Sequence, residues 1–397
     1  MPDAPQERPE APLAVMAKPV GSRCNMRCAY CYYLEKGQYS ESPRQTRMSF
    51  DLLERLIRQT VAASPGPVVS FTWHGGEPTL AGMDFYKKAL ELERKYLPKG
   101  REVWNNLQTN GLLLNEGWCR FLKENRFDVG LSIDGSEEVH DANRRLVNGA
   151  GTFRRVREAI RRLREAGLEP DLLCTVNRVS QEKPLEVYRA LRDTGAVWVQ
   201  FIPVVIRDQE GGAAPGSVTP EGYGRFLTAV FDEWVTHDLG RLDVQLFAEM
   251  ARIMAGGQAS LCWMSPDCGH VLIVEEDGAV YSCDHFVDPD HRLGTLYEGS
   301  LARMAGSGFQ RAFGNAKRDG LTGECRACPW LRFCNGGCLK DRFGVSLDGQ
   351  PGQYWLCPGL KAFFSHAEPI LEQVMAMSAQ GKKPPEIMAA LGEDLLG

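Results

Sequence analysis

Short apolar runs alternate with amphipathic stretches along the first half of the chain. Residues 13–20 form the first apolar run and predict a buried strand. Ser49 predicts the N-cap of a helix, because the apolar residues that follow it then share one helical face. That face comprises Phe50, Leu53, Leu56, Ile57 and Val61. Further strands are expected at 68–73, 103–108, 128–133, 171–176 and 198–205, and helices at 84–96, 116–125, 153–166 and 185–193.

Six strands that alternate with helices predict an α/β fold with a parallel, barrel-like sheet, whose chemistry belongs at the carboxyl ends of the strands. The pattern changes after residue 206. From Cys262 onward, eight Cys occur within 96 residues, and we expect short strands and turns instead of long helices. The predicted organisation is a disordered N-terminus at 1–12, a partial barrel at 13–206, a loop and helical linker at 207–260, a small metal-organised domain at 261–365 and a helical tail at 366–397.

Composition narrows the class of protein. A chain of 397 residues with 43% hydrophobic and 24% charged residues is typical of a globular protein. The net charge of -5 gives no electrostatic footprint for nucleic acid. We expect a cytoplasmic protein without a membrane partner, because the polar start lacks a signal-peptide h-region and no run approaches a membrane span. In a reducing compartment the 13 Cys indicate metal ligands, and the odd total argues against complete disulfide pairing.

The segment CNMRCAYC at residues 24–31 carries the first metal signal. Cys24, Cys28 and Cys31 can hold three iron atoms of a cubane and leave the fourth iron without a protein ligand. Fully ligated [4Fe–4S] clusters take four Cys, so the missing ligand indicates chemistry at the cluster. A structural zinc site is the alternative, but zinc usually takes four ligands at paired spacings, and no fourth Cys or His is nearby in the sequence.

This spacing, with Tyr30 before the third Cys, resembles that of the radical S-adenosylmethionine (SAM) enzymes. The resemblance implies that the open iron chelates SAM and that an electron from the cluster cleaves SAM to a 5′-deoxyadenosyl radical. Two later segments, each ordinary turn sequence on its own, resemble the SAM contacts of that superfamily. Gly75, Gly76 and Glu77 resemble its GGE segment, and Ser132 and Asp134 resemble its ribose or carboxylate contact.

The eight later Cys are enough for two sites of four ligands each. Their spacing alone leaves zinc and iron–sulfur equally open. Their order resembles the SPASM domain, a cluster-binding extension of radical SAM enzymes, which implies two auxiliary [4Fe–4S] clusters and three clusters in all. By that resemblance Cys262, Cys268, Cys283 and Cys338 hold the first auxiliary cluster, and Cys325, Cys328, Cys334 and Cys357 hold the second.

Segments along nearly the whole chain, including TWHGGEPTL, GLSIDG and QYWLCPGLKAFF, resemble those of the anaerobic sulfatase-maturating enzymes. Residues 271–283 predict a hairpin that turns at Asp277-Gly278 and delivers Asp284 to the end of a strand. Without the family, Asp284 is most simply a turn cap. The resemblance implies that Asp284 is a general base and that Tyr33 lies beside substrate or SAM, and it leaves the role of His74 open.

The reaction implied by the resemblance is oxidation of Cys or Ser, within a Cys/Ser-x-Pro-x-Arg segment of a sulfatase, to Cα-formylglycine. The implied partners are an unfolded or nascent sulfatase polypeptide and a one-electron reductant such as flavodoxin or ferredoxin. One alternative is another SPASM peptide modifier that forms thioether or carbon–carbon crosslinks. The other alternative is a zinc-stabilised protein-binding scaffold without catalysis.

Overall fold

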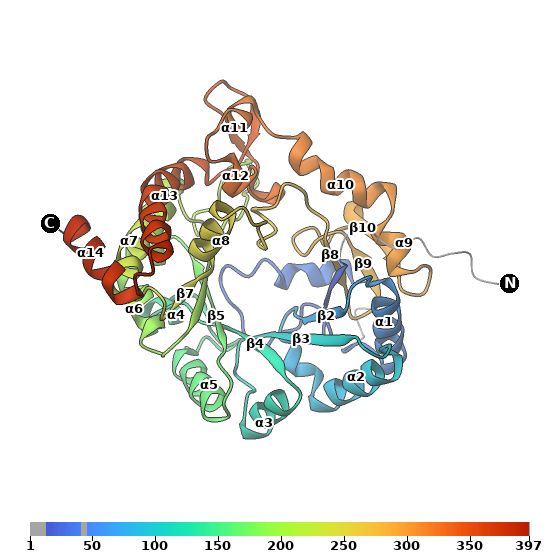
Figure 1. Cartoon of the computed structure of the whole chain (residues 1–397). Helices are drawn as coiled ribbons and strands as arrows, with labels where there is room; N and C mark the ends of the chain where they lie inside the picture. The colour runs from blue at the N-terminus through green and yellow to red at the C-terminus, as the bar shows by residue number, and fades with distance from the viewer. Residues whose placement is uncertain (1–12, 41–45, 397) are drawn as a thin grey trace. The chain divides into compact units, whose positions relative to one another are not determined.

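The computed structural model describes residues 13–40 and 46–396, so the disorder expected at 1–12 lies outside the described residues. The chain forms two compact units, and Figure 1 labels their helices and strands. Unit 1 comprises Met1–Leu131, Arg144–Pro170 and Asp267–Ala316, and unit 2 comprises Ser132–Asn143, Asp171–Pro266 and Lys317–Gly397. These boundaries differ from the domain organisation expected from the sequence, which stays a prediction.

Unit 1 is built on a sheet with the strand order β10-β9-β8-β1-β2-β3-β4. Strand β1 pairs in parallel with β2 on one side and β8 on the other, so that Val15 is opposite both Phe71 and Leu272. The β8–β9 and β9–β10 pairs are antiparallel. The strands are β1 Ala14–Ala17, β2 Val68–Trp73, β3 Glu102–Thr109, β4 Phe127–Ser132, β8 Val271–Val274, β9 Ala279–Tyr281 and β10 Arg292–Thr295.

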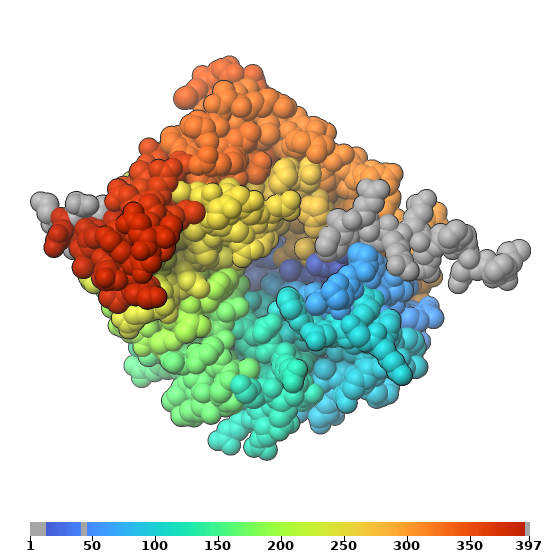
Figure 2. Space-filling model, viewed as in Figure 1, coloured from blue at the N-terminus to red at the C-terminus, as the bar shows by residue number. Residues whose placement is uncertain are grey.

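The helices of unit 1 follow the sequence pattern closely. Ser49 caps helix α1 by accepting a hydrogen bond from the Leu52 backbone N–H, as expected. Phe50 is an exception, because its side chain is 41% exposed at the first helical position and does not join the buried face. The elements are η1 Leu34–Tyr39, α1 Phe50–Ala63, η2 Pro78–Ala81, α2 Met83–Tyr96, α3 Glu116–Glu124, α5 Phe153–Glu165, η4 Pro289–His291, α9 Leu301–Ala305 and the start of α10 Gly308–Asp319. In the space-filling view, the side chains of residues 83–124 form a continuous outer surface, light blue to teal (Figure 2).

Unit 2 contains the parallel strands β5 Asp171–Val176, β6 Trp198–Pro203 and β7 Asp243–Val244. Helices α7 and α13 pack closely, since a Cβ on Gly359 would lie 1.8 Å from the Pro220 carbonyl oxygen. Only glycine therefore permits this approach. The remaining elements are α4 Glu137–Asn143, η3 Ser180–Glu182, α6 Pro184–Arg192, α7 Pro220–His237, α8 Gln245–Met254, α11 Gly323–Arg326, α12 Leu331–Cys334, η5 Leu339–Asp341, β11 Gly344–Val345, β12 Pro351–Gln353, α13 Cys357–Ala379 and α14 Pro384–Leu396.

All six strands predicted from the sequence are present, but the expectation for the Cys-rich region was partly wrong. Helix α13 runs for 23 residues from Cys357, because apolar residues such as Phe363 and Leu371 recur at helical spacing and are buried. The hairpin at Asp277-Gly278 is confirmed, yet its first strand pairs with β1 in the main sheet. Within the part of the chain that the structure describes, no helix is long and apolar enough to cross a membrane.

Candidate active site

Cys24, Cys28 and Cys31 lie on the irregular loop between β1 and η1 in unit 1. Backbone contacts shape this loop: the Cys31 N–H donates to the Cys28 carbonyl oxygen at 3.2 Å, and the Met26 N–H donates to Cys24 Sγ at 3.3 Å. Burial raises the pKa of Cys24 to about 12, and the charges of Glu77, Cys28 and Cys31 act in the same direction. Three Cys on one short loop fit the ligation of a metal cluster, which takes the thiolate form of each ligand. Beside them, the Arg144 guanidinium carbon lies 5.5 Å from the ring centroid of Tyr30.

The Gly75-Gly76-Glu77 segment is bound to the backbone that precedes Cys24. The Gly76 N–H donates to the Gly21 carbonyl oxygen at 2.8 Å, and the Glu77 N–H donates to the Arg23 carbonyl oxygen at 2.8 Å. A Cβ on Gly76 would lie 2.0 Å from that Arg23 oxygen, so a side chain at this position would displace the segment. The contact of this segment with SAM stays a prediction.

The Glu77 carboxylate is fully buried and organises the end of β3. It accepts hydrogen bonds from the Thr109 hydroxyl at 2.7 Å and the Asn110 N–H at 2.8 Å, besides two from Thr79. Burial raises the pKa of Glu77, and these hydrogen bonds oppose the rise. The Asn110 amide also donates to Asn25 Oδ1 at 2.8 Å and lies 3.7 Å from Cys24 Sγ. Asn110 was not among the site residues predicted from the sequence, although it directly follows strand β3, the position at which the parallel sheet carries its chemistry.

Asp284 follows β9, and both of its carboxylate oxygens are hydrogen-bonded. Lys18 Nζ lies 2.5 Å from Asp284 Oδ1, and the Tyr32 hydroxyl donates to Asp284 Oδ2. Lys18 is fully buried at the end of β1, and its ammonium also contacts His74 Nδ1 at 3.0 Å and Met16 Sδ at 3.1 Å. The sequence offered one signal for Lys18, namely a lone charge inside the apolar run at 13–20.

The charges around Asp284 explain its ionisation. Burial alone would raise the pKa of Asp284, but the positive charge of Lys18, which also donates a hydrogen bond to the carboxylate, holds this pKa well below its usual range. Burial and Lys18 together lower the pKa of His74 to about 3, so its imidazole is neutral. His74 Nδ1 receives the Gly75 N–H at 2.7 Å as well as the Lys18 ammonium, which places the imidazole proton on Nε2. His74, whose role the sequence left open, therefore supports the Lys18–Asp284 pair.

Tyr33 is buried next to this pair, whereas its neighbour Tyr32 is 41% exposed. Lys18 Nζ lies 4.3 Å from the centroid of the Tyr33 ring, and the Tyr33 hydroxyl donates to Glu275 Oε1. Burial raises the pKa of Glu275 to about 8, while Lys18 opposes the rise. The predicted contact of Tyr33 with substrate or SAM stays a prediction. The hydrogen bond from Tyr32 to Asp284 is one that sequence reasoning missed.

Ser132 and Asp134 belong to unit 2. The Asp134 carboxylate is fully buried and accepts a hydrogen bond from the Thr175 N–H at 2.9 Å, and its own N–H donates to His140 Nδ1 at 3.2 Å. Ser132 is the last residue of β4 and is partly buried. Asp134 thus ties the turn after β4 to strand β5, and the proposed contact of both residues with SAM stays a prediction.

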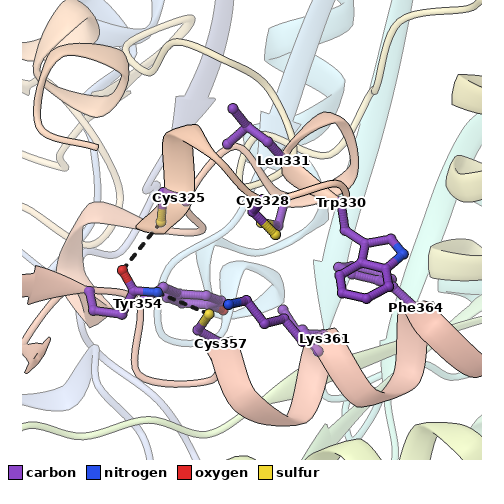
Figure 3. Close-up of a pocket in the computed structure, with 12 residues that line it drawn as sticks. Cys325, Cys328, Trp330, Leu331, Tyr354, Cys357, Lys361 and Phe364 are labelled. Atoms are coloured by element: carbon purple, nitrogen blue, oxygen red, sulfur yellow. Dashed lines mark hydrogen bonds between the residues drawn. The ribbon is translucent and has the colours of Figure 1, made fainter. Parts of the chain in front are cut away.

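One predicted set of four Cys converges on a single cavity in unit 2. The cavity is also lined by Trp330, Tyr354, Lys361 and Phe364. Figure 3 shows the sulfurs of Cys325, Cys328 and Cys357 turned toward this space. Four thiols around one cavity match the four-Cys ligation of a [4Fe–4S] cluster. This set is Cys325, Cys328, Cys334 and Cys357.

The other four predicted ligands are divided between the two units. Cys262 and Cys338 belong to unit 2, and Cys268 and Cys283 belong to unit 1. Burial raises the pKa of Cys338 to about 12, and the charges of Asp341 and Cys262 add to the rise. Cys262 therefore lies near enough to Cys338 for its charge to act on that thiol. Their sharing of a cluster with Cys268 and Cys283 stays a prediction.

Two protein families match this sequence, one in each part of the chain. Residues 19–195 match the radical SAM superfamily, and residues 262–329 match the SPASM iron-sulfur cluster-binding domain. The chain is 40% identical to a serine-type anaerobic sulfatase-maturating enzyme of Bacteroides thetaiotaomicron, over 97% of this chain and 96% of the relative. It is 33% identical to a cysteine-type anaerobic sulfatase-maturating enzyme of Clostridium perfringens, over 91% and 98% of the two chains.

Two solved structures complete the comparison. The anSMEcpe structure with bound AdoMet and Cp18Cys peptide has a TM-score of 0.83 and 33% identity, over 92% of this chain and 99% of that chain. Streptococcus suis SuiB bound to the precursor peptide SuiA has a TM-score of 0.58 and 15% identity, over 86% and 74%. The second likeness concerns the fold alone. Together these matches confirm the expected fold class, a partial radical SAM barrel followed by a SPASM domain.

Proposed function

This chain belongs to the anaerobic sulfatase-maturating enzymes of the radical SAM superfamily, and we propose that it oxidises one Cys or Ser of a sulfatase to Cα-formylglycine. The target lies within a Cys/Ser-x-Pro-x-Arg segment. The observation that carries the proposal is the buried Lys18–Asp284 pair, which presents an ionised carboxylate in the same unit as the three-Cys loop. Relatives of both the serine and the cysteine type match the chain, so both targets are tested.

The cofactors of this radical SAM and SPASM chain are [4Fe–4S] clusters and SAM. Cys24, Cys28 and Cys31 would hold the cluster that binds SAM, and the eight later Cys would hold two auxiliary clusters in the sets given above. When bound, these groups supply a radical that takes a hydrogen atom from Cβ of the target residue and an acceptor for the second electron. Tyr30, Gly75, Gly76, Glu77, Ser132 and Asp134 are the proposed SAM contacts, and Tyr33 is a proposed contact of substrate or SAM.

Asp284 is the residue that receives the proton of the target thiol or hydroxyl. Lys18 fixes Oδ1, whereas Oδ2 is bound by Tyr32, whose side chain is 41% exposed. A substrate group therefore reaches Oδ2 by replacing the Tyr32 hydroxyl. The target loses one hydrogen atom, one proton and one electron, so that serine yields the aldehyde directly. Cysteine yields a thioaldehyde, which water hydrolyses to the aldehyde with release of hydrogen sulfide.

The proposed partner is an unfolded or nascent sulfatase chain in the cytoplasm. A one-electron reductant such as flavodoxin or ferredoxin would supply the first electron. A reducing compartment keeps eleven proposed Cys ligands available for iron. The alternative of thioether or carbon–carbon crosslinking has less support, because the relatives that match nearly the whole chain are sulfatase-maturating enzymes.

The test is anaerobic incubation of iron-reconstituted protein with SAM, dithionite and a peptide that contains Cys-x-Pro-x-Arg or Ser-x-Pro-x-Arg. Mass spectrometry then follows 5′-deoxyadenosine and the peptide aldehyde. We expect both products, and their ratio measures coupling. A variant with Cys24, Cys28 and Cys31 all replaced by Ala is the control and is expected to form neither. Formation of 5′-deoxyadenosine without aldehyde from either peptide would overturn the proposed substrate.

A further inference from the structure

Gln353, the last residue of β12, bridges two of the Cys that surround the cavity of unit 2. Its Nε2 donates a hydrogen bond to Cys357 Sγ at 3.0 Å, and its Oε1 lies 3.3 Å from Cys325 Sγ. The side chain is almost fully buried, with 4% exposure. A buried amide that donates to a ligand sulfur is a specific arrangement, because a buried amide requires partners for both its ends.

Thr322 fixes which end of the amide faces which Cys. Its hydroxyl donates to Gln353 Oε1 at 2.7 Å and accepts the Cys325 N–H at 3.2 Å as the N-cap of α11. The carbonyl end of Gln353 is therefore directed to Thr322, and the NH₂ end to Cys357. A Cys325 thiol also donates to Oε1, but a metal-bound thiolate has no proton to donate. The Thr322 hydrogen bond would then remain and keep the amide oriented.

The rest of the cavity makes this hydrogen bond effective. Leu331, Leu360 and Phe364 give the cavity an apolar lining, which strengthens each electrostatic contact within it. Trp330 directs its indole N–H to Glu368 Oε2 at 2.8 Å, away from the sulfurs. Lys361 also lines the cavity and is paired with Glu324 at 2.5 Å. Gln353 thus provides a neutral donor aimed at a ligand sulfur.

We propose that Gln353 is a positioning residue that raises the reduction potential of the auxiliary cluster on Cys325, Cys328, Cys334 and Cys357. This inference rests on the proposed function only for the presence of that cluster. Reduction adds negative charge to the cluster and its sulfurs, so an N–H···S hydrogen bond stabilises the reduced form more than the oxidised form. Residues around the ligands of a metal site tune its potential in this way. Gln353 therefore favours electron transfer onto this cluster.

The experiment is a redox titration of the reconstituted protein, followed by electron paramagnetic resonance. The three Cys at 24, 28 and 31 are first replaced by Ala, so that only the two auxiliary clusters give signals. In this background we compare Gln353→Leu, which removes the amide, with Gln350→Leu. Gln350 is on the same hairpin, and its side chain bonds Gly323 and Asp348 instead of a sulfur, which makes it the matched control. We expect Gln353→Leu to lower one of the two potentials, with the other potential and the iron content unchanged.

A second variant distinguishes an effect on the cluster potential from a general disturbance of the structure. Thr322→Val removes the hydroxyl that orients the amide, and we expect a smaller shift of the same potential in the same direction. Unchanged potentials in Gln353→Leu with full iron content would overturn the proposal. Loss of iron from both variants, without a shifted signal, would also overturn it and leave Gln353 a structural role. Because the readout is a potential, a wild-type protein that made no formylglycine would refute the proposed substrate without deciding this test.

Discussion

Lys18 and Asp284 form an ion pair across 266 positions of the sequence, with 2.5 Å between Lys18 Nζ and Asp284 Oδ1. The pairing of β1 with β8 makes this contact possible, because it brings the hairpin that precedes Asp284 next to the end of β1. The Lys18 side chain is fully buried, and that of Asp284 is 16% exposed. A buried ammonium is costly without a counter-charge, so each residue of the pair requires the other.

Replacement of the proposed base separates SAM cleavage from peptide oxidation. We expect Asp284→Asn to retain 5′-deoxyadenosine formation but to lose most formylglycine, because the amide cannot accept the proton of the target. Mass spectrometry of both products measures the ratio. Asp288→Asn is the control, because this residue lies on the same segment and bonds His291. Undiminished formylglycine in Asp284→Asn would remove Asp284 as the base.

The contribution of this ion pair to folding can be tested by measuring the stability of variants. Asp284→Asn leaves Lys18 as an unpaired buried cation, which costs roughly 3 kcal/mol or more of folding free energy. The double variant Lys18→Met/Asp284→Asn removes both charges and should recover much of that loss. Thermal midpoints of the anaerobic holoprotein measure both effects.

An exposed ion pair provides the reference for the single and double variants at positions 18 and 284. The ion pair between Lys87 and Asp84 lies on the surface, with side chains 58% and 85% exposed. We expect no measurable cost when Lys87→Met breaks it. A double variant at 18 and 284 that is no more stable than Asp284→Asn would contradict the coupling.

The Gly76 position is expected to accept no side chain. In Gly76→Ala the new Cβ would lie 2.0 Å from the Arg23 carbonyl oxygen, so the segment before Cys24 must shift. We expect SAM cleavage to fall at least tenfold, measured as 5′-deoxyadenosine per minute. Gly66→Ala is the matched control, because nothing lies within 4 Å of a Cβ at that position. Equal activity of the two variants would show that the segment tolerates the displacement.

The raised pKa of Glu93 predicts that the free energy of unfolding depends on pH, independently of the clusters. Burial raises the pKa of Glu93 from 4.5 to about 7, although Asn105 donates a hydrogen bond to its carboxylate at 3.0 Å. A carboxyl whose pKa is raised by folding stabilises the protein below the unfolded pKa of 4.5, and this contribution is lost as the pH rises through about 7. Above that pH the ionised carboxylate costs on the order of 3 kcal/mol.

Glu93→Gln should therefore raise the thermal midpoint at pH 8 and change it little at pH 5. Its amide oxygen can still accept the Asn105 hydrogen bond. Glu91→Gln is the control, since this side chain lies on the same helix and is 64% exposed. If Glu93→Gln were no more stable than the wild-type protein at pH 8, the raised pKa of Glu93 would be refuted.

Local signals in the sequence were sufficient for most of the barrel. The strand at 68–73 and the helix that begins after Ser49 match the structure, because an apolar run and an N-cap are properties of neighbouring residues. The spacing of Cys24, Cys28 and Cys31 likewise predicts one ligand group, because all three are on one short loop, whereas the grouping of the eight later Cys came from the resemblance to the SPASM domain. The structure brings one predicted set of four ligands together, namely the four Cys around the cavity of unit 2.

Only the tertiary structure decided which residues surround Asp284. Tyr32 and Tyr33 are adjacent in the sequence, yet Tyr32 reaches Asp284 and Tyr33 reaches Glu275, because their side chains leave the loop in different directions. The pairing of β8 with β1 and the buried partners of Lys18 join segments more than 250 residues apart. Periodicity describes neighbours along the chain, whereas these contacts depend on which strands pair with one another in the sheet. That is why the sequence by itself predicted the strands, the helices and the candidate ligand Cys, whereas the fold determined the charge pair at the site.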